Sequence, residues 1–246
     1  MSAIALRELR GLLRTPQGWV LLAVTQFVTA WWYLLLLDRY RSQYEPMLRK
    51  LESSQGVADL VVAPFLGGLP LLTVLLAATA VLGMRSFAEE RRNATMPLLL
   101  AAPHRSAAIV AGKFLGSLAF LTLAVALWSA LPMTLALGTG LDFGRLAAGI
   151  LGLWLTGAAL LAVATLCSTL TEQPGVAALL GFGAGLALLL IGQGQGEGIL
   201  QYLGLTGHYQ VFLEGTVAIA DLAFFALLVL ASLVTAAWRV QRLREA

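Results

Sequence analysis

Long apolar segments alternate with short polar connections along the 246-residue chain. A transmembrane helix needs about 20 apolar residues, each of which adds about 1.5 Å of length. By that measure the sequence predicts six membrane-spanning helices, at residues 19–37, 60–84, 109–137, 146–170, 176–191 and 222–238. We therefore expect an all-α polytopic membrane protein in which residues 1–246 form one transmembrane domain.

Several of these segments depart from a plain apolar helix. The second and third contain Pro64, Pro70 and Pro132, which are expected to bend a membrane helix rather than abolish it. The fifth, residues 176–191, would reach only about 24 Å across a hydrocarbon core about 30 Å thick. The first follows a basic stretch, as in a signal peptide, but it lacks a small-residue cleavage site. We interpret it as a retained span.

The N-terminal segment, residues 1–16, combines apolar residues at helical spacing with basic residues between them. The apolar positions are Ile4, Leu6, Leu9, Leu12 and Leu13, and the basic positions are Arg7, Arg10 and Arg14. This pattern predicts an amphipathic helix that lies in the membrane interface. The alternative is a basic flank that only orients the first span. The regular apolar spacing favours the interfacial helix.

Composition and charge support a membrane location. The chain is 59% hydrophobic and 12% charged, about half the charged fraction usual in soluble domains. Its formal charge of +3 could suggest nucleic acid, but the basic residues lie beside apolar spans, so we expect no nucleic-acid partner. Eleven Lys and Arg residues flank one side of the six spans and five flank the other. The richer side holds both termini, which places them in the cytoplasm.

A highly charged segment, residues 85–106, separates the second and third spans. Its four consecutive charges, Glu89-Glu90-Arg91-Arg92, would add roughly 10 kcal/mol to the insertion cost of any span that contained them. The segment must therefore lie outside the hydrocarbon. Residue spacing predicts a helix to about Thr95, in which Glu89 faces Arg92 or Asn93.

The second half of this segment predicts a bend and another short helix. Pro97 suits the first position of that helix, and Pro103 would end it. Leucines at 98–100 would then be exposed beside charges, which suggests a docking surface. A plain loop whose leucines fold back onto the membrane is the alternative. Physical reasoning alone leaves these two interpretations open.

The connection between the last two spans, residues 192–221, contains no Lys or Arg and several apolar clusters. A solvated loop would not need those clusters, and the preceding span is short. We therefore predict that the chain re-enters the outer leaflet here as one or two short helices.

Catalytic and nucleotide-binding patterns are missing from the sequence. No span pairs carboxylates or carries two histidines at helical spacing. The spans therefore lack the side chains that hydrolysis, metal binding or a proton relay would need. The pair Gly112-Lys113 has neither the upstream glycine nor the following Ser or Thr of a P-loop. We expect a chain that is not an enzyme and binds no cofactor itself, so that energy for any uphill movement comes from another subunit.

Residues 86–116 match the pattern Phe-x-x-Glu-(Glu/Lys)-x-x-x-Thr-x-x-x-Leu-(Leu)-x-x-Pro-x-(Arg/Ser), followed by a small apolar stretch and Gly-Lys. The corresponding residues are Phe87, Glu90, Arg91, Thr95, Leu99, Leu100, Pro103, Arg105, Gly112 and Lys113, where Arg91 is a basic residue at the Glu/Lys position. In this pattern the segment resembles the cytoplasmic connection between the second and third helices of type-2 ABC export permeases. A second stretch is similar to the gliding-motility and nitrous-oxide-reductase-maturation branch of that family. It carries the run His208, Phe212, Gly215 and Asp221 before the last helix.

The resemblance implies a mechanism and a set of partners. Two permease subunits, usually a homodimer, would pair with two P-loop ABC ATPase subunits that bind ATP and Mg, in a bacterial inner membrane, and auxiliary outer or periplasmic proteins could join them. The cytoplasmic segment would dock in a cleft of the ATPase. Its implied coupling residues are Phe87, Glu89, Glu90, Arg91, Arg92, Thr95, Leu98, Leu99 and Pro103. The long outer domain of some relatives is absent, so no large external partner is expected.

Two functions fit these implications. The chain could be the permease subunit of an ATP-driven exporter, or a membrane anchor or assembly factor that recruits an ATPase without transport. The spans present no ionisable cluster, which suits a lipid-like or amphipathic cargo, although a polysaccharide or a sulfur- or metal-linked species also fits a dimer interface.

Overall fold

The structure is a computed structural model that describes residues 2–44, 58–96, 105–137, 142–191 and 203–245. Helices form its regular secondary structure, and the described residues contain no strand. Five helical segments within these ranges are long and apolar enough to cross a membrane: Pro16–Tyr44, Leu60–Arg92, Ser106–Ala136, Phe143–Ser168 and Ile219–Glu245. The prediction of an all-α polytopic membrane protein is confirmed.

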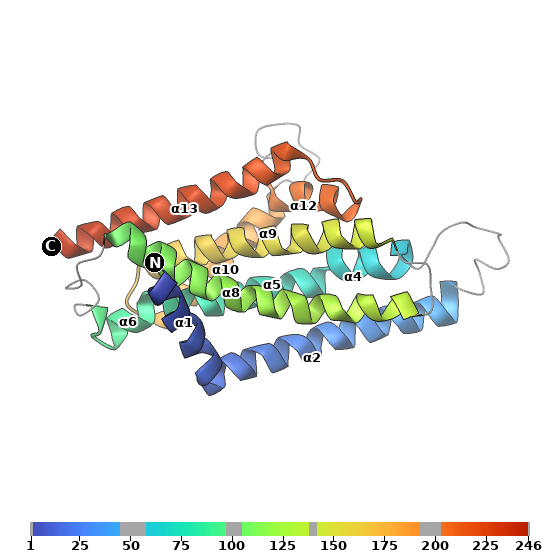
Figure 1. Cartoon of the computed structure of the whole chain (residues 1–246), viewed down its shortest axis with the longest axis horizontal. Coiled ribbons are helices and arrows are strands. Elements are labelled where there is room, and N and C mark those ends of the chain that lie inside the picture. The colour runs from blue at the N-terminus through green and yellow to red at the C-terminus, as the bar shows by residue number, and fades with distance from the viewer. Residues whose placement is uncertain (1, 45–57, 97–104, 138–141, 192–202, 246) are drawn as a thin grey trace.

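The first half of the chain forms α1 (Ser2–Arg14), α2 (Pro16–Arg39), a π-helical turn (Tyr40–Tyr44), a second such turn (Ala58–Val62), α4 (Ala63–Gly67), α5 (Leu69–Ser86) and α6 (Ala88–Arg92). The second half forms α8 (Ser106–Met133), a 3₁₀ turn (Thr134–Leu137), α9 (Phe143–Ser168), α10 (Pro174–Leu190), α12 (Leu205–Leu213) and α13 (Ile219–Glu245). The long helices run side by side along the molecule (Figure 1). Helix α9 is the central one, because it packs against α5, α8, α10, α12 and α13.

The second span is interrupted between α4 and α5. Gly68 has an extended backbone (φ −71°, ψ 144°), and α5 begins beside Pro70, which cannot donate a backbone hydrogen bond. Pro132, in contrast, lies inside α8, and a 3₁₀ turn follows that helix. The break in the second span frees carbonyl groups at the end of α4, and one of them, that of Leu66, accepts a hydrogen bond from Tyr209 at 2.9 Å.

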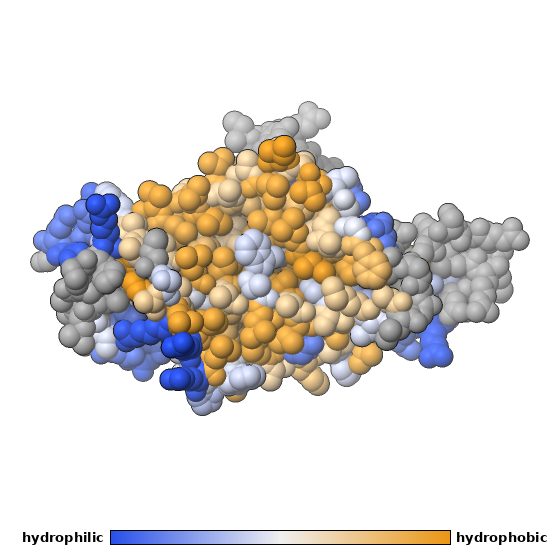
Figure 2. Space-filling model, in the orientation of Figure 1, coloured by the Kyte–Doolittle hydropathy of each residue, from blue (hydrophilic) through white to orange (hydrophobic). Residues whose placement is uncertain are grey.

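Both termini lie at the same end of the bundle as α6 (Figure 1). Figure 2 shows apolar residues over the middle of the molecule and hydrophilic residues gathered toward its two ends. This arrangement agrees with the expectation that the termini and the charged segment share one side of the membrane. Helix α10, at 17 residues, is shorter than the membrane-length helices, so the sixth crossing and the identity of the cytoplasmic side stay predictions.

Candidate functional site

Helix α6 carries the run of four charges, and a serine from another helix caps its start. The Ser168 hydroxyl, at the end of α9, accepts hydrogen bonds from the backbone N–H groups of Phe87 at 3.0 Å and Ala88 at 2.9 Å. It donates to the Met84 carbonyl at 3.3 Å. The first N–H groups of a helix have no partner within the helix. Ser168 therefore supplies from α9 the cap that the local sequence lacks.

The end of α6 corrects the sequence prediction. Its helical residues stop at Arg92 rather than near Thr95. Ala94 has a positive φ of 55°, and the N–H groups of Ala94 and Thr95 bond to the carbonyls of Arg91 and Glu90, at 3.1 and 3.0 Å. These two bonds form a Schellman motif, in which a left-handed residue ends the helix. The chain leaves the helix here although the spacing of apolar residues continues, and the two bonds of the turn satisfy these last carbonyl groups.

Lys113 is the centre of an ion cluster that joins three helices. Its ammonium lies 2.6 Å from a Glu90 carboxylate oxygen on α6 and 3.2 Å from one of Glu8 on α1. Its side chain is 1% exposed. Lys113 lies within α8, near the start of the predicted third span. A buried ammonium is stable only with charged or hydrogen-bonding partners, so α1 and α6 both stabilise this one.

The other charges of α6 have different partners. Arg91 donates to Glu172, in the turn between α9 and α10, at 2.7 Å, and to the Thr169 carbonyl at 3.5 Å. Glu89 pairs with Arg85 at 3.2 Å, four residues earlier, instead of facing Arg92 or Asn93. Arg92 is exposed, and so are the three residues that follow it. Three of the four charges therefore hold α6 in place, and the fourth lies on the surface.

Phe87 and Met96 form the apolar side of this segment. They pack with Ile109 and Val110 of α8 and with residues near the end of α13. Phe87 is fully buried, so its side chain anchors the segment rather than forming a docking surface. The predicted coupling residues Leu98, Leu99 and Pro103 lie outside the described residues.

Helix α1 crosses α8 at Gly116. A Cβ atom at that glycine would lie 2.6 Å from the Glu8 Cβ and 2.7 Å from the Ala5 carbonyl oxygen, so only glycine allows this approach. The predicted helix is present, and Arg7, Arg10 and Arg14 are all exposed on it. Its location in a membrane interface stays a prediction.

A second cluster brings together three of the four predicted residues of the connection before α13, namely His208, Phe212 and Asp221. His208 Nδ1 lies 2.6 Å from Asp221 Oδ1, and the His208 ring stacks on Phe224 at 3.9 Å between centroids. Phe212 contacts Phe225 edge to face at 6.1 Å. Gly215 adopts φ +88° next to Arg145. Residues 192–202 of the predicted re-entrant segment lie outside the described ranges, and the membrane depth of α12 stays a prediction.

Sequence reasoning missed four residues that organise these two clusters. Three of them, Glu8, Ser168 and Glu172, contact α6 or Lys113, and the fourth is the buried Tyr209. Burial raises the pKa of the Tyr209 hydroxyl above its usual range. Glu172 could have been noticed as an isolated acid in a connection without basic residues. Ser168 carried no local signal, because its partners are 80 or more positions away.

Comparison with known proteins adds one finding to this geometry. The family model described as ABC-2 family transporter protein matches residues 2–221. The match covers the α1–α6–α8 cluster as well as the His208–Asp221 pair. A search of curated proteins finds no match to the chain. Within the described residues, no group of three or more His, Cys, Asp or Glu side chains could hold a metal ion.

Proposed function

The chain belongs to the ABC-2 family of transporter proteins, and on that premise we propose that it is the membrane permease subunit of an ATP-driven exporter. It pairs with a second copy of itself and with two separate ABC ATPase subunits, which bind ATP and Mg. It lies in a bacterial inner membrane with both termini and α6 in the cytoplasm. It is a transport subunit and not an enzyme.

The observation that carries this proposal is the shared partner of Glu8 and Glu90. Both carboxylates contact the same buried ammonium of Lys113, so α1 and α6 are tied to α8 at one point. A movement imposed on α6 would have to break a buried ion pair or displace α1 and α8 with it. Because both glutamates are partly exposed, breaking one of these pairs would cost about 1 kcal/mol, and leaving the buried ammonium with neither carboxylate would cost about 3–5 kcal/mol. Displacing the helices together is the cheaper response.

The contacts of α6 divide it into an inner and an outer side. Phe87, Glu90 and Arg91 contact the rest of the chain, whereas Arg92 is exposed at the end of the helix. In the proposed complex the exposed end contacts the ATPase, and the inner side passes its movement to α1, α8 and α9. Glu90 and Arg91 then couple α6 to the rest of this chain. Arg92 and Thr95 make the direct contact with the ATPase.

Reconstitution with the ABC ATPase in proteoliposomes tests this division. Arg92→Glu should weaken ATPase binding at least tenfold. Lys113→Met should leave binding within about twofold but abolish the stimulation of ATP hydrolysis by the permease. Arg41→Glu, a charge reversal at an exposed site in the π-helical turn that follows α2, is the matched control and should change neither. Unchanged binding and turnover in both test variants would overturn the proposal.

The alternative of a non-transporting anchor predicts a different result in the same liposomes. An anchor would still bind the ATPase through Arg92, but Lys113→Met would not alter ATP turnover. An exporter requires that ATPase binding and ATP turnover be coupled, so Lys113→Met would alter turnover.

A further inference from the structure

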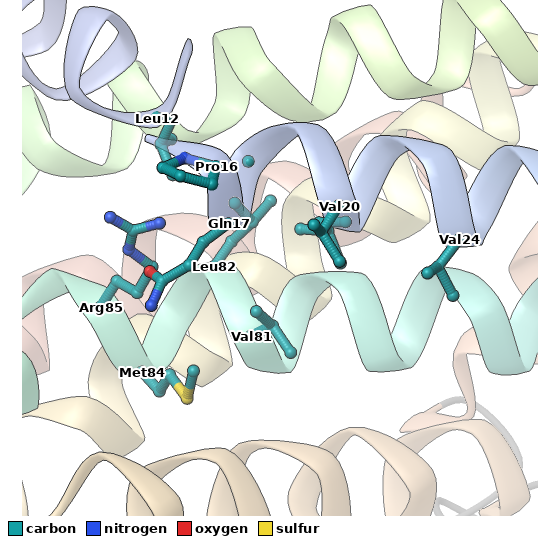
Figure 3. Close-up of a pocket in the computed structure, with 11 residues that line it drawn as sticks. Leu12, Pro16, Gln17, Val20, Val24, Val81, Leu82, Met84 and Arg85 are labelled. Carbon is teal, nitrogen blue, oxygen red and sulfur yellow. The ribbon is translucent and has the colours of Figure 1, made fainter. Parts of the chain in front are cut away.

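An apolar groove of about 480 Å³ lies beside the α6 end of the bundle, between α2 and α5. Figure 3 shows Val20 and Val24 of α2 on one wall and Val81 of α5 on the other. Leu12 and Pro16, where α1 turns into α2, close one end. The volume falls in the range of ordinary ligand sites, about 300–1,000 Å³.

The turn between α1 and α2 that shapes this groove is held rigidly. Gly18 is buried against α1, and a Cβ atom there would collide with the Leu12 carbonyl oxygen. The Trp19 indole N–H donates to the Leu13 carbonyl at 2.7 Å. Pro16 occupies the first turn of α2, where its fixed φ suits a helix start. The groove is therefore a built feature of the fold.

Polarity changes along the groove as it does along an amphiphile. The Gln17 and Arg85 side chains lie together at one end, and apolar side chains, among them three valines, line the rest (Figure 3). Gln17 and Val24 are seven residues apart, about 10 Å along a helix, so the groove spans less than one leaflet of a hydrocarbon core about 30 Å thick. A ligand that matches this gradient has a polar head at Arg85 and an acyl chain against Val20, Val24 and Val81.

The charge at the polar end selects the head group. Arg85 is 17% exposed, and a guanidinium binds phosphate in a bidentate geometry. Its ion pair with Glu89 is made through Nε, at 3.2 Å. Arg7, Arg10 and Arg14 are exposed on the adjoining helix α1 and add positive potential at the same end of the bundle. An anionic head is favoured over a zwitterionic one.

We propose that this groove binds one anionic phospholipid from the leaflet on the α1 and α6 side, with its phosphate at Arg85 and one acyl chain between α2 and α5. Arg85 pairs with Glu89 of α6, so the bound phosphate shares a guanidinium with the helix that carries the coupling charges. Binding of the lipid at this site would therefore affect α6 through Arg85. The binding site itself requires only that the chain lies in a membrane, whether or not it is an exporter.

Native mass spectrometry of the full chain in detergent, with phosphatidylglycerol or phosphatidylcholine added, tests the proposal. The unchanged chain should retain one phosphatidylglycerol at least tenfold more tightly than phosphatidylcholine. Arg85→Gln should reduce that preference to within about threefold. Val20→Trp, which fills the groove from an exposed position, should abolish tight binding of both lipids.

Matched controls separate the site from general effects of charge and bulk. Arg92→Gln removes an exposed arginine of α6 that does not line the groove, and Val28→Trp adds the same bulk two turns further along α2. Both should bind lipid like the unchanged chain. Equal affinity for the two lipids, or a preference that survives Arg85→Gln, would overturn the proposal. So would a dimer that dissociates only in Val20→Trp, because the groove would then hold a second copy of the chain.

Discussion

The Lys113 ammonium and the Glu90 carboxylate lie 2.6 Å apart, and the lysine is almost fully buried. Glu8 lies 3.2 Å from the same ammonium, so two carboxylates from separate helices share one cation. A surface ion pair contributes little to stability, with a median of about 0–1 kcal/mol. Burial of the lysine changes this, because removal of its partners leaves a charge in an apolar environment. The cluster therefore links three helices more firmly than exposed pairs would.

The two glutamates should show strong coupling in a double-mutant cycle. Glu8→Gln and Glu90→Gln each leave Lys113 with one carboxylate, and because both glutamates are partly exposed we expect each to cost about 1 kcal/mol of unfolding free energy. The double variant should cost more than the sum by about 1 kcal/mol or more, since no anion remains. Denaturant unfolding in detergent measures the unfolding free energy of the two single variants and of the double variant. Glu214→Gln, at an exposed site, should change stability by less than about 0.5 kcal/mol. Additive costs would contradict the shared-cation interpretation.

Ser168→Ala should destabilise the start of α6. The variant removes the acceptor of two buried N–H groups, those of Phe87 and Ala88, so a loss of about 1–3 kcal/mol is expected. Amide hydrogen exchange of residues 87–92 should be faster in this variant than in the unchanged chain. Ser129→Ala is the control, because its hydroxyl only donates to the Val125 carbonyl of its own helix. Equal effects of the two variants would mean that Ser168 does not cap α6.

Ala94→Gly should stabilise the protein. Ala94 holds φ at 55°, a conformation that costs an L-residue roughly 1–2 kcal/mol and that glycine adopts freely. We expect a gain of about 1 kcal/mol in thermal unfolding, reduced by the extra freedom of glycine in the unfolded chain. Ala147→Gly, in the regular helix α9, should instead lose about 1 kcal/mol. A loss at residue 94 would show that its left-handed turn is absent.

Tyr209→Phe should loosen the contact between α12 and the break after α4. The substitution removes the 2.9 Å hydrogen bond to the Leu66 carbonyl, which we expect to cost about 1 kcal/mol. Tyr44→Phe, at an exposed site, should cost almost nothing. A Tyr209→Phe variant as stable as the unchanged chain at neutral pH would contradict this role.

The Tyr209 contribution should also depend on pH. Burial raises the pKa of its hydroxyl in the folded chain, whereas an unfolded tyrosine ionises near pH 10. The stabilisation is therefore fully present below about pH 10 and declines as the pH rises above it, because ionisation favours the unfolded state. The difference in unfolding free energy between the unchanged chain and Tyr209→Phe, measured from pH 8 to 11, should shrink at the alkaline end.

Much of the fold could be predicted from the sequence because the relevant signals are local. Apolar length located the membrane-length helices, and helical spacing located α1. Pro64 and Pro70 predicted a bend in the second span, and the structure goes further by interrupting the helix at Gly68. The helix boundary after Arg92 was predicted less well, since the spacing of apolar residues continues past the point where the left-handed turn ends the helix.

Hydrophobicity and periodicity by themselves determined which segments are apolar helices, because transfer free energy depends on composition along the chain, and they predict that the charges of α6 lie outside the hydrocarbon. Only the tertiary structure decided which charges pair. In sequence, Glu89 has Arg85 and Arg92 at helical pairing distance, and such local pairs contribute only a few tenths of a kcal/mol, whereas Glu90 has no basic residue at that spacing. Packing of α1 at Gly116 and capping by Ser168 bring Glu8 and Glu90 to Lys113. The choice follows from burial of the lysine, whose desolvation cost those carboxylates offset.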